Sequence, residues 1–386
     1  MTKPKVAFVT PGSFPIPSPG SSSVERVIEK MAPLLQSEVT VRIYGRTGRK
    51  LKRIGNVGGV RCERFPAGDK SMYIARICRA IRSFMPDIVQ VENRPKNIEK
   101  IKKRYPNSKI WLNLHSTTFI SPKAISLSSL RRSFLLADRI IVNSEFLREA
   151  VAERVPEAAS KLRVVHIGVE PSRFLSRHSP EGEERRERLR SARKWEGRSV
   201  VLYMGRVVPY KGVHHLLRIM PRLIACHPDV LLVIVGSPFY GSHRTTSYSR
   251  GLQRLGKKYP HHVRFVPYVP YHEVPDWFLA ADVAVVPSGA REAFGLVNVE
   301  AMACGIPVVA SRAGGIKEVV VHEETGYLVL PDRMEEELAE RLLQLLKDEE
   351  LRINMGRSGR ERIERQFTWE NTARRWLSLL QEDSPT

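Results

Sequence analysis

The sequence predicts an α/β protein made of two doubly wound domains, each built on a mostly parallel sheet. Three observations support this prediction. The chain has 386 residues, enough for two domains that each bury a full core. Short apolar runs rich in β-forming residues alternate with helical stretches in both halves. A charged interval without strands, residues 178–199, separates the halves.

The first half, residues 1–177, is expected to form an N-terminal domain. Its predicted strands are residues 6–10, 39–44, 88–92, 110–115, 139–143 and 164–167. Helix-like segments lie between them, at residues 23–35, 72–84 and 145–154. Strands separated in this way favour a parallel sheet covered on both faces. Residues 178–199, rich in Glu and Arg, are expected to bury little, and we interpret them as a linker or charged helix.

The second half, residues 200–366, repeats the alternation. Its predicted strands are residues 200–204, 231–235, 263–266, 283–286, 308–310 and 327–330. Two predicted helices lie at residues 212–226 and 294–304, and the chain becomes helical and charged after Asp332, ending in a helix at 368–381. Open α/β sheets bind ligands beyond the carboxyl ends of their strands. We therefore expect two domains that face each other across a cleft containing the site.

Composition and cysteine usage indicate a cytoplasmic protein. The hydrophobic content is 42%, and no apolar run approaches the roughly 20 residues that a membrane span needs. The N-terminus enters a strand pattern directly, without the apolar region and cleavage site of a signal peptide. The cysteines lie far apart and are expected to be reduced, mostly buried thiols: Cys62, Cys78, Cys226 and Cys304.

The charge is large and uneven. The formal net charge is +22, and residues 1–170 hold 31 Lys and Arg against 14 Asp and Glu. The N-terminal half is thus expected to meet something anionic, although a basic solvated surface explains the same excess. Nucleic acid is the weaker interpretation, because the basic residues are dispersed and no binding motif accompanies them.

The most informative stretch runs from residue 284 to residue 310. It predicts a buried strand, a loop with Glu292, a helix beginning near Phe294 and a second strand opening at Pro307. Glu300 follows Glu292 by eight positions and falls inside the helix. A carboxylate beside a helix N-terminus, where backbone amides are unpaired, suits an anionic, hydroxyl-rich ligand.

Three further candidates lie at predicted strand ends. A Pro-, Ser- and Gly-rich loop begins at Gly12 and lets backbone amides approach a ligand, but a plain surface turn explains it as well. His115 closes the strand at 110–115, where a structural histidine is the alternative. Arg206 leaves the first strand of the second half and Lys211 precedes a helix, as a diphosphate site requires; the alternative is an ordinary basic loop.

Taken together, three motifs reveal a family resemblance. They are Gly205-Arg206 with Lys211-Gly212, the two glutamates Glu292 and Glu300 separated by seven residues, and Ala303-Cys-Gly-Ile-Pro-Val. The chain resembles glycosyltransferase family 4, whose members are retaining enzymes with the two-domain GT-B fold. The resemblance runs from Val6 to Trp376.

The resemblance implies roles for the donor-binding residues of the second half. Arg206 and Lys211 would hold the diphosphate of a nucleotide-sugar and stabilise the departing charge. Glu292 would hydrogen-bond the donor sugar, and Glu300 the ribose hydroxyls. Further donor contacts would come from the segment 267–271 that contains Val269, along the nucleobase, and from the amides of Phe294, Gly295 and Leu296.

The resemblance also implies roles for residues of the first half. His115 matches the histidine that reaches the donor sugar near its 6-position. Residues 367–386 would form a C-terminal helix that crosses back to the N-terminal domain, which would bind the acceptor. Gly20 would belong to a loop near the donor phosphate. Many relatives have Gly-Gly there, whereas Gly20 is followed by Ser21-Ser22-Ser23, which puts the loop's contact with donor or acceptor in question.

The expected reaction needs no metal or other cofactor. The sequence contains no Asp-x-Asp, and Arg206, Lys211 and helix dipoles would instead stabilise the leaving group. The resemblance implies front-face attack, in which the leaving phosphate helps to deprotonate the acceptor hydroxyl. The alternatives are a non-catalytic nucleotide-sugar-binding or structural member of the fold, and a GT-B epimerase or phosphorylase; a phosphorylase is disfavoured because no pyridoxal lysine stands out.

The expected partners are a UDP- or GDP-sugar donor and an acceptor that belongs to a cell-surface or envelope glycan. The basic N-terminal half favours a glycolipid or anionic polymer as acceptor, or peripheral contact with the anionic inner face of a membrane. Donor sugar, base and linkage are not specified by these motifs.

Overall fold

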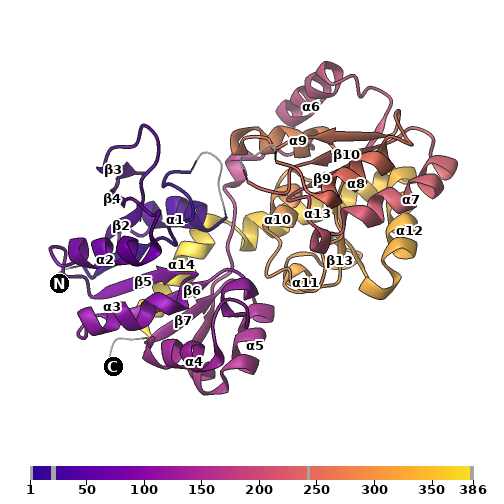
Figure 1. Cartoon of the computed structure of the whole chain (residues 1–386). Coiled ribbons are helices and arrows are strands. Elements are labelled where there is room, and N and C mark those ends of the chain that lie inside the picture. Colours follow the sequence, from indigo (N-terminus) through magenta and orange to yellow (C-terminus); the bar gives the residue numbers. More distant parts are fainter. Residues whose placement is uncertain (1–2, 19–22, 241–243, 383–386) are drawn as a thin grey trace. The chain divides into compact units, whose positions relative to one another are not determined.

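The computed structural model describes residues 3–18, 23–240 and 244–382. The chain divides into two compact units (Figure 1). Unit 1 comprises residues 1–167 together with 369–386, and unit 2 comprises residues 168–368. Within the described residues, none of the helices combines the length and the apolarity that a membrane crossing requires.

Unit 1 is built on an eight-stranded sheet with the order β3-β4-β2-β1-β5-β6-β7-β8. All neighbouring strands are parallel except β3 and β4. The strands are β1 (Lys5–Val9), β2 (Thr40–Arg46), β3 (Ile54–Val57), β4 (Val60–Phe65), β5 (Ile88–Glu92), β6 (Lys109–Leu114), β7 (Arg139–Val142) and β8 (Leu162–Val164). The helices are α1 (Ser23–Leu34), α2 (Lys70–Ile81), α3 (Ile98–Arg104), α4 (Leu127–Leu136), α5 (Glu145–Arg154) and α14 (Trp369–Gln381).

The hairpin β3–β4 is absent from the sequence prediction. Val57 pairs with Val60, so the turn consists of Gly58 and Gly59, with φ of 55° and 83°. Two central residues with positive φ match the twist of antiparallel strands, and glycine adopts that conformation without steric cost.

Helix α14 completes the core of unit 1. The indole of Trp376 is fully buried and packs against Phe8 and Trp111, with ring centroids 5.8 and 5.1 Å away. Figure 1 shows this last helix among strands and helices from the start of the chain. Two segments far apart in the sequence therefore share one hydrophobic core.

Unit 2 contains a six-stranded parallel sheet with the order β11-β10-β9-β12-β13-β14. Counted from β9, this is the 3-2-1-4-5-6 order of dinucleotide-binding sheets, so the predicted doubly wound fold is confirmed. The strands are β9 (Ser199–Met204), β10 (Val230–Val235), β11 (Val263–Val266), β12 (Val283–Val286), β13 (Val308–Ser311) and β14 (Gly326–Val329). The helices are α6 (Pro180–Ala192), α7 (Val213–Cys226), α8 (Ser247–Gly256), α9 (Val274–Ala280), α10 (Leu296–Ala303), α11 (Ile316–Val319), α12 (Met334–Lys347) and α13 (Glu349–Gln366).

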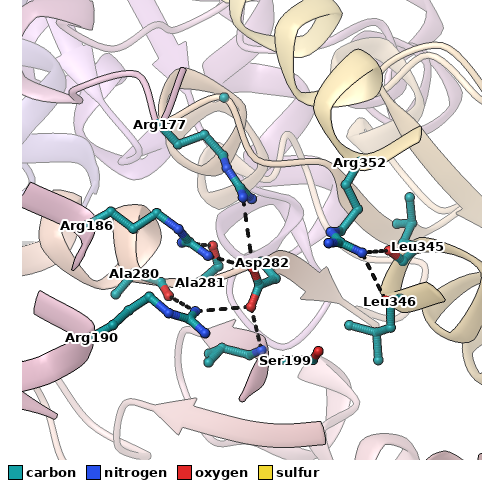
Figure 2. Close-up of polar contacts among 12 residues, drawn as sticks. Arg177, Arg186, Arg190, Ser199, Ala280, Ala281, Asp282, Leu345, Leu346 and Arg352 are labelled. Atoms are coloured by element: carbon teal, nitrogen blue, oxygen red, sulfur yellow. Dashed lines mark hydrogen bonds and ion pairs between the residues drawn. The ribbon is translucent and has the colours of Figure 1, made fainter. Parts of the chain in front are cut away.

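The charged interval 178–199 contains α6 and belongs to unit 2. Although α6 is mostly exposed, its Arg186 and Arg190 donate hydrogen bonds of 2.5 and 3.1 Å to Asp282, just before β12. Figure 2 shows these guanidinium groups and that of Arg177 pointing toward Asp282. Burial alone would raise the pKa of Asp282, but the arginines more than offset it and hold the pKa below 3.8. Ion pairs rather than apolar packing attach this helix to the sheet.

The cysteines follow the expectation only in part. All four are free thiols. Cys62 and Cys304 are buried and Cys78 is half-buried, in line with the expectation of mostly buried thiols. Cys226, at the end of α7, is exposed and departs from that expectation.

Candidate active site

The predicted cations of unit 2 lie in the loop after β9. Residues Pro209–Lys211 form a 3₁₀ turn, and Gly212 then caps α7 with φ of 73°. A Cβ at Gly212 would lie 1.9 Å from the carbonyl oxygen of Pro287, so glycine is required where this loop meets the loop after β12. The contact brings Lys211 to Glu292, and the ammonium group donates a hydrogen bond to the carboxylate.

Lys211 and Glu292 form a largely buried ion pair, with side chains 19% and 15% exposed. Burial alone would raise the pKa of Glu292, but the charge and the hydrogen bond of Lys211, with smaller contributions from Ser288 and then from the charge of Arg206, more than offset burial and lower that pKa. Burial would likewise lower the pKa of Lys211, and Glu292 raises it instead. Both groups are therefore charged at neutral pH.

Arg206 lies beside this pair on a partly aromatic surface. Its guanidinium carbon is 5.5 Å from the ring centroid of Tyr210 and 5.4 Å from that of Tyr240, and it also donates to the Tyr210 hydroxyl. Among the described residues, nothing accepts a hydrogen bond from its buried Nε. A buried, unpaired guanidinium N–H is a group that an anionic ligand would satisfy.

The backbone of Glu292 is held by the loop after β13. Gly315 donates a hydrogen bond of 3.0 Å to the Glu292 carbonyl oxygen. A Cβ at Gly314, whose φ is 54°, would lie 1.9 Å from the same oxygen. Gly314 and Gly315 therefore fix the position of the loop that carries the Glu292 carboxylate.

The helix after Glu292 begins at Leu296, near Phe294 as predicted. Gly295 caps α10 with φ of 78°, and Asn298 donates to the Gly295 carbonyl oxygen at 3.0 Å. The first amides of a helix have no partner within it, so this start offers N–H groups next to Glu292. The side chain of Phe294 is buried, with its ring 6.0 Å from that of Phe367, which leaves its backbone as the part suited to a ligand.

Two other predicted donor residues are placed by unit 2. Glu300 lies within α10 and is 5% exposed. Val269 is half-buried in the loop after β11, at the same edge of the sheet as the loops after β9 and β12. Gly20, with Ser21 and Ser22, lies outside the described residues.

His115 belongs to unit 1, where it directly follows β6. Its side chain is 4% exposed, and its Nε2 lies 2.8 Å from the carboxylate of Glu92. The sequence analysis missed Glu92, which ends the neighbouring strand β5 and is fully buried. Two polar residues, Gln90 and Glu92, in a short strand that otherwise holds only Ile and Val were the available signal.

No group of three or more His, Cys, Asp or Glu side chains in the described ranges could hold a metal ion. Arg206, Lys211 and Glu292 follow β9 and β12, the two strands between which the connection order of unit 2 reverses. Proteins with such sheets bind nucleotides at this switch point. Unit 2 thus has the fold of the doubly wound α/β class, whose members include many nucleotide-binding proteins.

The comparisons with known proteins identify the family. Residues 24–173 match the model of "Glycosyltransferase Family 4", and residues 184–362 match that of "Glycosyl transferases group 1". Spore coat protein SA of Bacillus subtilis (strain 168) is 30% identical and covers 98% of this chain and 100% of its own length. The putative glycosyltransferase YtcC of the same organism is 31% identical, over 98% of this chain and 92% of its own length. The chain belongs to the family 4 glycosyltransferases of the group 1 type.

Solved structures confirm the GT-B fold. The crystal structure of Anabaena Alr3699/HepE in complex with UDP-glucose has a TM-score of 0.75 and 22% identity, and covers 98% of this chain and 99% of its own. The family matches confirm the predictions of family and glycosyltransferase activity, and the structural likeness confirms the prediction of the fold.

Proposed function

We propose that the chain transfers a sugar from UDP- or GDP-sugar to an acceptor hydroxyl, with retention of anomeric configuration and without a metal. The observation that carries the proposal is the Lys211–Glu292 ion pair next to Arg206, at the switch point of unit 2. Two cations and one carboxylate there match a ligand that has a diphosphate beside hydroxyl groups.

The cations would act on the leaving group. A departing nucleoside diphosphate gains negative charge, which Arg206, Lys211 and the amides at the start of α10 would stabilise from fixed positions. The unpaired Nε–H of Arg206 supports this assignment. These groups supply the charge that a metal would otherwise provide.

Glu292 would bind hydroxyls of the donor sugar rather than attack its anomeric carbon. Its carboxylate is already engaged by Lys211, which lowers its nucleophilicity and fixes its orientation. We further propose that Glu300 binds the ribose, that Val269 lies along the base, and that the leaving phosphate takes the acceptor proton in front-face attack.

The proposed acceptor is an anionic envelope glycan or glycolipid. In unit 1, Arg46, Lys70 and Arg94 surround the loop after β1 and donate to Ser13, Gly12 and Asn93 carbonyl oxygens. Burial lowers the pKa of Lys70, and the neighbouring charges of Arg94 and Arg46 lower it further, although Glu25 opposes them. The relative named as a spore coat protein fits a surface glycan. We place the enzyme in the cytoplasm, at the inner membrane face.

A donor screen with Glu292→Gln tests the proposal. The protein is incubated with UDP- and GDP-sugars and acceptor extracts, and products are followed by mass spectrometry with and without EDTA. Turnover should withstand EDTA and fall by about 10²–10³-fold in the variant. Glu187→Gln, which makes the same change at an exposed glutamate of α6, serves as the matched control.

Other outcomes distinguish the alternatives. Calorimetric binding of a nucleotide-sugar without turnover of any donor would indicate a non-catalytic binder. Conversion of the donor sugar without acceptor would indicate an epimerase. Near-normal turnover by Glu292→Gln would contradict the assignment of this carboxylate.

A further inference from the structure

A continuous series of buried hydrogen bonds connects helix α14 to His115 inside unit 1. The indole Nε1 of Trp376 donates to Oε1 of Gln90 at 2.6 Å. Nε2 of Gln90 donates to Oε1 of Glu92 at 2.7 Å, and the other carboxylate oxygen lies 2.8 Å from Nε2 of His115. Gln90, Glu92 and Trp376 are fully buried, and His115 is 8% exposed.

The direction of each hydrogen bond in this series follows from which of its two groups can donate. An indole N–H only donates, so the atom of Gln90 that faces Trp376 is the amide oxygen, and the amide NH₂ faces Glu92. A carboxylate only accepts, so Nε2 of His115 must carry the proton that is shared with Glu92. In a neutral imidazole the other nitrogen, Nδ1, then has a bare lone pair.

That lone pair has no partner in the described part of the chain, although Nδ1 is buried. The backbone of His115 is held separately: its N–H donates to Oδ1 of Asn93 at 2.8 Å, and its carbonyl oxygen accepts from Nδ2 of Asn143 at 3.4 Å. The end of β6 therefore does not need the ring to keep its shape. The hydrogen bond to Glu92 therefore fixes the orientation of the ring and not that of the backbone. A buried acceptor without a partner is unfavourable, and a hydrogen-bond donor on a ligand would satisfy it.

We propose that Glu92 is a positioning residue that holds His115 as the Nε2–H tautomer, so that Nδ1 accepts a hydrogen bond from a substrate hydroxyl. This role rests on the proposed function, because the hydroxyl belongs to a sugar substrate. Glu92 does not touch the substrate. It fixes whether His115 accepts or donates, and thereby selects a hydroxyl over a group that cannot donate.

The variant Glu92→Gln reverses the polarity. Because the NH₂ of Gln90 still needs an acceptor, the new amide oxygen stays on the Gln90 side and the new NH₂ faces Nε2 of His115. Nε2 then becomes the acceptor, and the proton moves to Nδ1. The nearly isosteric substitution thus converts an acceptor into a donor.

Nitrogen-15 NMR of protein with labelled histidine measures the tautomer directly. His115→Gln assigns the His115 signals among the 11 histidines. The expected result is a protonated Nε2 and bare Nδ1 in wild type, reversed in Glu92→Gln. Trp376→Phe, which removes the hydrogen bond to Gln90 but keeps the Glu92 carboxylate, should leave the wild-type tautomer unchanged. A wild-type His115 with Nδ1 protonated, or a tautomer unaffected by Glu92→Gln, overturns the proposal.

The family resemblance implies that His115 reaches the donor sugar near its 6-position. A kinetic experiment therefore compares whichever donor the enzyme turns over with its 6-deoxy-6-fluoro analogue. Fluorine accepts but cannot donate, so wild type should prefer the hydroxyl form in kcat/KM, and Glu92→Gln should reduce that preference by about 10-fold or more. An unchanged preference contradicts the role of Nδ1. The NMR result needs no turnover, so failure of the proposed function and failure of this inference are distinguishable.

Discussion

Replacing Lys211 by Met tests the electrostatics of the candidate site most directly. The substitution keeps most of the aliphatic stem and removes the charge, which leaves the Glu292 carboxylate largely buried with Arg206 as the nearest remaining cation. Removing one partner of a buried ion pair costs roughly 3–5 kcal/mol. Because the two side chains keep 19% and 15% exposure, we expect the lower end, about 3 kcal/mol at pH 7.

The loss should depend on pH in a defined direction. In wild type the pKa of Glu292 lies below its ordinary 4.5, so its stabilisation is present above pH 4.5 and is lost as pH falls through the folded value. Lys211, with a raised pKa, contributes fully below pH 10.5 and less above it. Without Lys211, burial should raise the pKa of Glu292. Protonation then relieves the unpaired charge, and the deficit of the variant should shrink toward pH 4.

Urea unfolding, with hydrogen exchange to identify the transition of unit 2, measures this difference. The double variant Lys211→Met/Glu292→Gln removes both charges and should regain at least half of the lost stability. A Lys211→Met protein as stable as wild type at pH 7, or a deficit that grows as pH falls, would refute the reasoning.

Two other substitutions give separate expectations. Gly314→Ala places a Cβ against the Glu292 carbonyl oxygen at positive φ, so it should destabilise unit 2 by about 1–3 kcal/mol and weaken donor binding; calorimetry showing unchanged affinity would contradict the loop's role. Asp282→Asn leaves Arg186 and Arg190 without their carboxylate and should lower Tm by roughly 6–12 °C, which corresponds to about 3 kcal/mol in a unit of this size. An unchanged Tm would show that the neighbouring backbone carbonyls suffice.

The sequence predicted most strands because their apolar runs are continuous, as in β10 (Val230–Val235), where every residue is buried. It missed β4, in which charged residues interrupt the pattern. Arg64 of that strand is only 4% exposed, because its guanidinium donates to the carbonyl oxygens of Ile16 and Lys52. Composition alone cannot show that distant backbone groups will satisfy a buried charge.

The residues of the candidate site likewise fall into those that the sequence predicted and one that it missed. Arg206, Lys211 and Glu292 were found because each stands at a strand end in a motif, and the structure brings Lys211 and Glu292 into contact. Glu92 was missed because its partners come from β6 and, through Gln90, from α14. The local pattern can mark Glu92 as a polar residue in a buried strand, but it cannot show that His115 and Trp376, so distant in sequence, will join it in one series of hydrogen bonds.

The discontinuity of unit 1 has a consequence for biosynthesis. Trp376 fills the core beside Phe8, yet it is translated after all of unit 2. At about 5–20 residues per second, the roughly 200 residues of unit 2 take about 10–40 s to synthesise. Throughout that interval the N-terminal part of unit 1 lacks the helix that completes its core, and the apolar surface that Trp376 covers in the folded chain stays exposed.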